Sequence, residues 1–215
     1  NEQPSRLDRI GATFFRDKIV LDFGCGGGAF LDLVSGLSRE TLGIEPFSGY
    51  HESLIDRGHE MFSNMETAQS KYKDKVDSIV SFCVLEHVQN PQQYLKDACS
   101  LLKKSGKMYL ETDNIHNILM KFNINSFDEF FYRTAHLYYF EDKTLRKMAE
   151  QAGFSDIRIS FRHNYDMSNV MLWLRDNKPT GNGKLDFLSN GVDQNWIEFV
   201  ESSGLADLVC IEMTK

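Results

Sequence analysis

The sequence has little that would mark a membrane protein, a secreted precursor or a domain held together by metal. Its longest apolar cluster, residues 170–174, is far shorter than the roughly 18 residues of a membrane span. No basic segment followed by an apolar core opens the chain, so we expect no secretory leader. The cysteines stand apart, without C-x-x-C spacing, at Cys25, Cys83, Cys99 and Cys210. We therefore expect a cytoplasmic protein with free thiols and no structural zinc.

Positive charge is also scarce. The 24 lysines and arginines are outnumbered by 31 aspartates and glutamates, which gives a formal net charge of −7. Nucleic-acid binding depends on clustered basic side chains that neutralise phosphates, so we expect no nucleic-acid partner. With 41% apolar residues, a chain of 215 residues can form a globular domain with its own core.

Short apolar runs alternate with amphipathic stretches along the chain, a pattern typical of a parallel sheet covered by helices. We expect strands at residues 19–23, 41–45, 76–82, 106–112, 156–161 and 207–213, with a weaker edge strand at 60–62. Helices are expected at residues 28–35, 91–103, 142–152, 168–175 and 194–202. Pro91 suits a first helical turn, and Gly106 and Gly153 suit helix C-caps.

Two long segments, residues 113–140 and 164–205, interrupt this alternation. The first is rich in aromatic side chains, and the second separates the last two strands. Long connections inside an α/β domain are usually lids or interface elements. Because the last strand must return to the same sheet, we expect a single domain over residues 1–215 with both segments as insertions.

A glycine-rich loop directly follows the first strand. Gly24-Cys25-Gly26-Gly27-Gly28 can bring backbone N–H groups close to a ligand, because glycine has no Cβ and tolerates positive φ. Glu45, 17 residues after Gly28, ends the second strand, where a carboxylate can accept both hydroxyls of a ribose. The loop also fits the pattern G-x-G-x-x-A, so the glycines alone leave a nicotinamide dinucleotide open.

Asp22 stands two residues before the first glycine, and the resulting pattern D-x-G-x-G-x-G resembles motif I of class I S-adenosylmethionine-dependent methyltransferases. The resemblance implies a Rossmann-like α/β fold. In that fold a seven-stranded, mostly parallel sheet has its last strand antiparallel and helices on both faces. The resemblance also implies that S-adenosylmethionine is the cofactor and that Asp22 organises the loop and the ammonium group of the ligand.

A second stretch, residues 76–88, resembles the methyltransferase pattern F-D-x-V-x-x-x-x-V-L-E-H-V, with Val76 in place of the usual aromatic residue. The resemblance implies contacts to the methionyl end of the cofactor near residues 82–83 and to the adenine near residues 65–66. Taken together, the two motifs assign the following residues to the cofactor: Asp22, Gly24, Cys25, Gly26, Gly28, Glu45, Pro46, Met65, Glu66, Phe82, Cys83 and His87.

The distal half resembles small-molecule methyltransferases of bacterial capsule and lipopolysaccharide gene clusters, through residues 127–133, 136–140 and 168–174. Some members of that group methylate sugar hydroxyls, and one branch methylates a phosphoramidate. The resemblance implies transfer to an oxygen of a small acceptor, sugar-linked or a phosphoramidate or nucleotide-sugar, in surface polysaccharide biosynthesis. Both insertions would form the acceptor side, although a homodimer contact is equally consistent with the aromatic one.

A hydroxyl acceptor loses a proton during methyl transfer, and histidine titrates in a suitable range for the base. We favour His136, in the aromatic insertion, and His87, beside the expected methyl donor, as catalytic residues. His87 is equally consistent with a helix-cap hydrogen bond. An anionic acceptor needs no base and would be held by Arg133 or Arg162. Substrate contacts are expected from Tyr132, Arg133, His136, Tyr139 and His163.

A metal site could be built from four residues of this region, Glu86, His87, Asp113 and His116. Adjacent residues rarely bind one ion, and no His-x-x-x-His spacing supports a site, so we expect none. Three functions stay open: a methyltransferase, a nicotinamide-dependent oxidoreductase on a related fold, and a non-catalytic partner that binds S-adenosylmethionine. The acid before the glycine loop and the 85–87 stretch favour the first.

Overall fold

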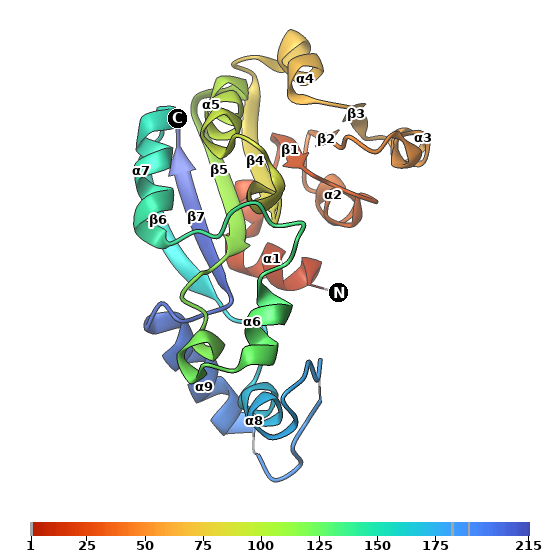
Figure 1. Cartoon of the computed structure of the whole chain (residues 1–215). Helices are drawn as coiled ribbons and strands as arrows, with labels where there is room; N and C mark the ends of the chain where they lie inside the picture. The colour runs from red at the N-terminus through yellow and green to blue at the C-terminus, as the bar shows by residue number, and fades with distance from the viewer. Residues whose placement is uncertain (1, 182, 189) are drawn as a thin grey trace.

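The sheet that the sequence predicts is present in the computed structural model, which describes residues 2–181, 183–188 and 190–215. Within these residues seven strands pair in the order β3-β2-β1-β4-β5-β7-β6 (Figure 1). β7 is antiparallel to both of its neighbours, and the other pairs are parallel. The predicted Rossmann-like methyltransferase fold is thereby confirmed. The strands are β1 (Ile19–Phe23), β2 (Glu40–Ile44), β3 (Glu60–Phe62), β4 (Val76–Phe82), β5 (Leu102–Asp113), β6 (Ser155–Arg162) and β7 (Leu208–Thr214).

Helices cover both faces of the sheet because its central strands are apolar on both sides. On one face Phe30 of α2 (Ala29–Ser35) packs with Val80 and Tyr109, and α1 (Gln3–Ile10) joins the same cluster. α3 (His51–Asp56) packs against α2. On the other face Leu95 and Leu145 pack with alternate residues of the same strands. They belong to α5 (Pro91–Leu101) and α7 (Asp142–Ala152), and α5 lies between α7 and α4 (Met65–Tyr72).

Two of the three predicted helix signals are confirmed. Pro91 occupies the first turn of α5, and Gly153 ends α7 with a φ of +98°. The prediction for Gly106 is wrong, because α5 ends at Leu101 and β5 begins at Leu102 without a turn. A Cβ at Gly106 would lie 2.9 Å from the carbonyl oxygen of Lys103, so this glycine permits a close backbone approach inside the strand.

The two insertions pack on each other beyond the end of the sheet at which β5 finishes (Figure 1). They contribute α6 (Asn125–Phe131), α8 (Met167–Asp176) and α9 (Asn190–Ser202), which we call the helical cap. The cap has its own buried cluster, which includes Phe127, Phe131, Val170 and Trp173. None of the helices in the described part of the chain is long and apolar enough to cross a membrane.

A buried ion network ties the N-terminal helix to the sheet. Glu111 of β5 is fully buried, and its Oε2 accepts hydrogen bonds from Arg6 at 2.8 Å and Arg162 at 2.9 Å. Arg162 also lies 3.2 Å from Glu2. The expectation that Arg162 could hold an anionic acceptor is therefore wrong, because its guanidinium is committed to these two carboxylates.

Replacing Arg162 with Met should lower the free energy of unfolding by roughly 2–3 kcal/mol, as measured by urea denaturation. Breaking a buried pair usually costs roughly 3–5 kcal/mol, and Arg6 still neutralises part of the Glu111 charge. The matched control is Arg158→Met, an exposed position on the same strand. Equal stabilities of the two variants would contradict the structural role of Arg162.

Candidate active site

The glycine loop lies between β1 and α2, at the edge where the parallel strands end. Gly24 and Gly28 both have a φ of +80°, a conformation that favours glycine. A Cβ at Gly24 would overlap the side chain of Val84, and one at Gly28 would overlap that of Leu54. The loop therefore needs glycine at both positions, and its backbone is the surface that it offers to a ligand.

The other residues assigned to the cofactor follow the ends of the neighbouring strands. Glu45 and Pro46 come directly after β2, Met65 begins the helix after β3, and Cys83 follows β4. Because the carboxyl ends of parallel strands meet at one edge, the fold brings these positions to the side of the sheet that carries the loop. Their contacts to a cofactor remain predictions.

Asp22 is a buried acidic residue near the end of β1, just before the glycine loop. It is 3% exposed, and its Oδ1 has no hydrogen-bond partner among the described residues. Burial raises the pKa of Asp22 to about 7, with a smaller rise from Glu45, while Arg6 opposes the shift. An unsatisfied carboxylate oxygen in such a place fits a cation, and the ammonium group of S-adenosylmethionine is one.

Glu45 connects the loop to the second strand. Its Oε2 accepts a hydrogen bond from the N–H of Gly26 at 3.0 Å, and its Oε1 accepts one from the N–H of Phe47 at 2.9 Å. Each carboxylate oxygen can accept a further hydrogen bond, so ribose hydroxyls can still be bound there. The residues present therefore fit S-adenosylmethionine at both its aminoacyl and its ribose ends.

The two cysteines at this edge are not nucleophiles. Burial raises the pKa of the Cys25 thiol to about 12, and burial likewise raises the pKa of the Cys83 thiol. Both thiols are therefore protonated at neutral pH. Cys83 has a φ of +55°, and its backbone N–H donates to the carbonyl oxygen of Glu111 at 2.9 Å.

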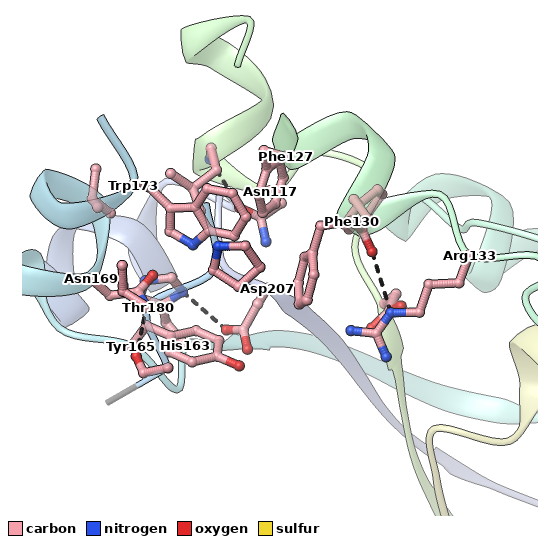
Figure 2. A pocket seen from close by; sticks show the side chains of 16 residues that line it. Asn117, Phe127, Phe130, Arg133, His163, Tyr165, Asn169, Trp173, Thr180 and Asp207 are labelled. Carbon is pink, nitrogen blue, oxygen red and sulfur yellow. Dashed lines mark hydrogen bonds and ion pairs between the residues drawn. The ribbon is translucent and has the colours of Figure 1, made fainter. Parts of the chain in front are cut away.

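A cavity of about 270 Å³ lies between the helical cap and the ends of β5 and β7 (Figure 2). None of its lining residues belongs to the glycine loop, so it is separate from the predicted cofactor edge. Aromatic side chains of the helical cap form part of its walls, and polar groups enter it from the strand ends and from the cap. The lining residues used below are Asp113, Phe127, Phe130, Arg133, His163, Trp173, Thr180 and Asp207.

Two histidine–aspartate pairs stand at adjoining strand ends beside this cavity. Nδ1 of His136 lies 3.0 Å from Oδ2 of Asp113, the last residue of β5. Nδ1 of His163 lies 3.0 Å from Oδ1 of Asp207, the residue before β7. Asp113 is paired with Leu208 in the β5–β7 ladder, so the strand register brings the two aspartates close together.

His136 has the environment of a base. Its side chain is 8% exposed, and burial lowers its pKa below the usual value, an effect that Asp113 opposes and that His87 and Arg133 reinforce. Its Nδ1 is within ion-pair distance of Asp113 but is not aligned for a hydrogen bond. Such contacts are often poorly aligned without ligands and tighten in the reacting complex. A neutral imidazole oriented by a carboxylate follows from this arrangement.

His87 supports the segment that carries His136. Its Nδ1 lies 2.9 Å from the carbonyl oxygen of Ala135, and its ring meets that of His136 edge-on with centroids 4.7 Å apart. The carbonyl oxygen of the preceding residue, Glu86, accepts a hydrogen bond from the N–H of Leu137 at 2.8 Å. The contact to Ala135 is structural, but it is not the helix cap that the sequence suggested, because Ala135 lies outside the helices. The closeness of His87 to His136 keeps a role in the reaction open.

Glu86, His87 and His136 offer three possible metal-ligand atoms within 4.8 Å of one another. Glu86 and His87 were candidates for a metal from the sequence, whereas His136, 49 residues after His87 in the chain, was not. We nevertheless predict that dialysis against EDTA leaves turnover unchanged, because displacement at a sulfonium methyl needs no Lewis acid. The measurement is the initial rate before and after dialysis. A loss that Mg²⁺ or Zn²⁺ restores would identify the cluster as a metal centre.

The residues predicted to contact the substrate separate into two groups. Arg133 and His163 line the cavity. His136 is not among the lining residues, but it pairs with Asp113, which is. Tyr132 and Tyr139 are not among the lining residues. The hydroxyl of Tyr139 donates to the carbonyl oxygen of Phe131 at 2.6 Å and so supports α6. Tyr132 is 49% exposed and meets Tyr139 edge-on. Substrate contacts of these two residues stay predictions.

Sequence reasoning missed several cavity residues. Trp173 was placed only in an expected helix, yet it is 3% exposed and forms a wall of the cavity. Asp207 was assigned only to a strand, and Thr180 only to the second insertion. These residues share no spacing pattern that could have revealed them, because each lies on a different segment and they meet only in the folded chain.

Comparison with known proteins agrees with this geometry. A family model described as a methyltransferase domain matches residues 2–159. The ubiquinone biosynthesis O-methyltransferase of Yersinia enterocolitica is 31% identical over 125 residues, which cover 52% of this chain and 50% of that protein. Its counterpart in Aeromonas salmonicida is 30% identical over 122 residues, with the same coverage. The chain thus spans about half the length of the curated relatives it matches.

Solved structures show the same fold. A SAM-dependent methyltransferase from Archaeoglobus fulgidus has a TM-score of 0.67 at 22% identity, over 98% of this chain and 92% of that one. Phosphoethanolamine N-methyltransferase 2 of Haemonchus contortus, in complex with S-adenosylhomocysteine, has a TM-score of 0.63 at 15% identity, over 100% of this chain and 53% of that one. With the family match over residues 2–159, the conclusion is that this chain belongs to the class I S-adenosylmethionine-dependent methyltransferases.

Proposed function

We propose that this protein transfers a methyl group from S-adenosylmethionine to a hydroxyl oxygen of a small acceptor bound in the cavity under the helical cap. The observation that carries the proposal is the His136–Asp113 pair. It stands at the end of β5, the strand next to β4 in the sheet, and Asp113 itself lines the cavity. A base in this position can reach an acceptor hydroxyl on one side while the cofactor edge lies on the other.

S-adenosylmethionine, when bound, supplies an electrophilic methyl group and a neutral leaving group. Asp22 holds the ammonium group, and Glu45 holds the ribose. Asp113 orients the imidazole of His136 through Nδ1, which leaves Nε2 to take the proton from the acceptor hydroxyl. The aromatic walls of the cavity position the acceptor and exclude water. Positioning alone can account for roughly 7–11 kcal/mol of the barrier.

Replacing Glu45 with Gln should weaken binding of S-adenosylhomocysteine by about 1–2 kcal/mol, because the amide nitrogen cannot accept hydrogen bonds from Gly26 or from a ribose hydroxyl. Calorimetric titration measures the effect. Glu52→Gln, an exposed position on α3, is the matched control and should bind like the parent protein. An unchanged dissociation constant for Glu45→Gln would contradict the ribose assignment.

We further propose that the acceptor is sugar-linked, a nucleotide-sugar or phosphoramidate included, as the resemblance to capsule and lipopolysaccharide enzymes implies. The second candidate is a phenolic acceptor, since the curated relatives are named ubiquinone biosynthesis O-methyltransferases. A cavity walled by Phe127, Phe130 and Trp173 suits the flat face of either kind of ring.

The test is transfer of radiolabelled methyl from S-adenosylmethionine to panels of nucleotide-sugars, free glycosides and catechols. Incorporation into any hydroxyl, lost in His136→Gln, supports the proposal. A protein that binds S-adenosylhomocysteine but methylates none of these would instead fit a non-catalytic partner. Binding of NADH in place of S-adenosylhomocysteine would revive the oxidoreductase alternative.

We also propose that the protein works in the cytoplasm as a single domain, with residues 113–140 and 164–205 forming the acceptor side. Its four cysteines are free, in keeping with a reducing compartment. A homodimer stays a prediction, and analytical ultracentrifugation of the purified protein tests it.

A further inference from the structure

The second histidine–aspartate pair lies inside the cavity and has no part in the proposed proton transfer. His163 is 8% exposed, and its Nδ1 lies 3.0 Å from Oδ1 of Asp207. Asp207 also accepts hydrogen bonds from the backbone and side-chain N–H groups of Asn164, at 3.0 and 2.9 Å. As an ionised carboxylate, Asp207 accepts all three contacts, and Nδ1 of His163 is then the donor.

The opposite ring nitrogen, Nε2 of His163, is buried and lacks a hydrogen-bond partner in the part of the chain that the structure describes. With the proton on Nδ1, a neutral ring presents Nε2 as an acceptor. Oγ1 of Thr180 is likewise buried, with no partner in the same described ranges. Both residues line the cavity (Figure 2). Buried polar atoms are normally paired, so these two point to polar groups of a ligand.

The rest of the lining defines what kind of ligand carries those groups. Trp173 meets Phe127 edge-on with ring centroids 5.3 Å apart, and it lies 5.5 Å from Phe130. These aromatic faces suit the face of a ring. Asp113 and Asp207 place two carboxylates in the lining against the single guanidinium of Arg133. That guanidinium already lies 4.9 Å over the Phe130 ring, so the lining favours an uncharged ligand over an anion.

We propose that His163 and Thr180 form a second polar subsite, which binds a hydroxyl group of the acceptor other than the one that is methylated. Of the acceptor classes proposed above, this selects an uncharged ring over a nucleotide-sugar or a phosphoramidate. The ring carries at least two hydroxyl groups, one at the His136–Asp113 pair and one at the His163–Asp207 pair. The inference rests on the proposed function, since it takes this cavity as the acceptor site. A glycoside and a catechol both have the required chemistry.

The experiment is a calorimetric titration of the full chain, saturated with S-adenosylhomocysteine, with three probes: methyl α-D-glucopyranoside, 4-methylcatechol and UDP-glucose. We expect one of the two uncharged probes to bind most tightly, which also identifies the source of the hydroxyls. In His163→Phe its dissociation constant should rise about tenfold, the size expected for a lost buried hydrogen bond. Thr180→Val, which keeps the shape of the side chain, should also weaken binding.

Retained affinity for S-adenosylhomocysteine shows that each variant is folded. His116 lies outside the cavity lining, so His116→Phe is the control for loss of an imidazole. Tighter binding of UDP-glucose than of both uncharged probes overturns the inference, and so does failure of both uncharged probes to bind. Unchanged affinity in both His163→Phe and Thr180→Val overturns it as well. Binding that depends on His163 in a protein without methyl transfer would overturn the proposed function alone.

Discussion

Replacing Asp22 with Asn is expected to weaken binding of S-adenosylhomocysteine by roughly 2–3 kcal/mol, or about 30- to 150-fold. The same change should make the cofactor-free protein more stable at pH 8. Both effects have one cause. The carboxyl group of Asp22 is 3% exposed, and one of its oxygens has no partner in the part of the chain described. Ionising such a group is costly unless a cation is bound. Asn has nearly the same shape and no charge, so it removes the cost together with the partner for the ligand ammonium.

The pH dependence has a definite sign. The pKa of the Asp22 carboxyl rises from 3.8, its ordinary value, which applies to the unfolded chain, to about 7 in the folded protein. Between these values the native state keeps a proton that the unfolded state has lost, so the Asp22 contribution to stability falls as pH rises through this window. Above the pKa of Asp22 in the folded protein, about 7, the whole of this contribution to stability has been lost. The stability advantage of Asp22→Asn should therefore be absent near pH 4 and largest at pH 8.

Cofactor affinity should change with pH in the opposite direction. A cationic group binds the ionised form of Asp22, so the affinity of the parent protein for S-adenosylhomocysteine should increase as pH rises from 6 to 8. Asp22→Asn should show no such increase. Thermal unfolding with and without the ligand measures both effects, and Asp8→Asn, exposed on α1, is the control. Destabilisation of the ligand-free Asp22→Asn protein at pH 8 would show that the side chain is structural.

The cofactor edge could be predicted from the sequence because its geometry is local. Asp22 and the glycines lie within seven consecutive residues, and the strand before them and the helix after them are set by short apolar patterns. Glu45 is one parallel strand away, at a position that strand pairing determines. In such a segment, the residue types needed for a tight turn and for ligand contact are the same residues that a pattern can identify.

The acceptor side could not be predicted in the same way. Asp113, His163, Thr180 and Trp173 are spread over some 70 residues of chain, and only the pairing of β5, β7 and β6 brings their segments together. His136 was predicted from its place in the aromatic insertion, but Asp113, the partner that the structure gives it, was considered only as a metal ligand. Side chains that meet through sheet register leave no fixed spacing in the sequence.

The errors of the sequence analysis have related causes. Gly106 was taken for a helix cap because glycine commonly ends helices, yet here α5 passes into β5 without a turn. Arg162 was taken for an anion ligand because an arginine at a strand end is often exposed. Its partner Glu111 lies 51 residues earlier, and no local pattern connects the two.

Replacing His136 with Gln is expected to lower kcat by roughly 10²–10⁴-fold, the usual contribution of a general base, while the affinity for S-adenosylhomocysteine stays unchanged. The base must be unprotonated to act. Because burial holds the pKa of His136 below its ordinary 6.5, the acid limb of the kcat/KM profile should lie below pH 6.5, with a plateau through neutral pH. The matched control is His116→Gln, an exposed histidine that pairs with Glu141 at 3.4 Å.

Asp113→Asn separates a base from a merely structural histidine. The carboxylate raises the pKa of His136, so its removal should move the acid limb to still lower pH. Turnover should fall at the same time, because Asn does not hold the imidazole with Nδ1 protonated and Nε2 free. A structural role predicts no shift of the limb in Asp113→Asn and comparable losses of stability and activity in His136→Gln. Full activity of His136→Gln at saturating acceptor would contradict the role of His136 as a base. The acceptor would then be already anionic, so that no base is needed.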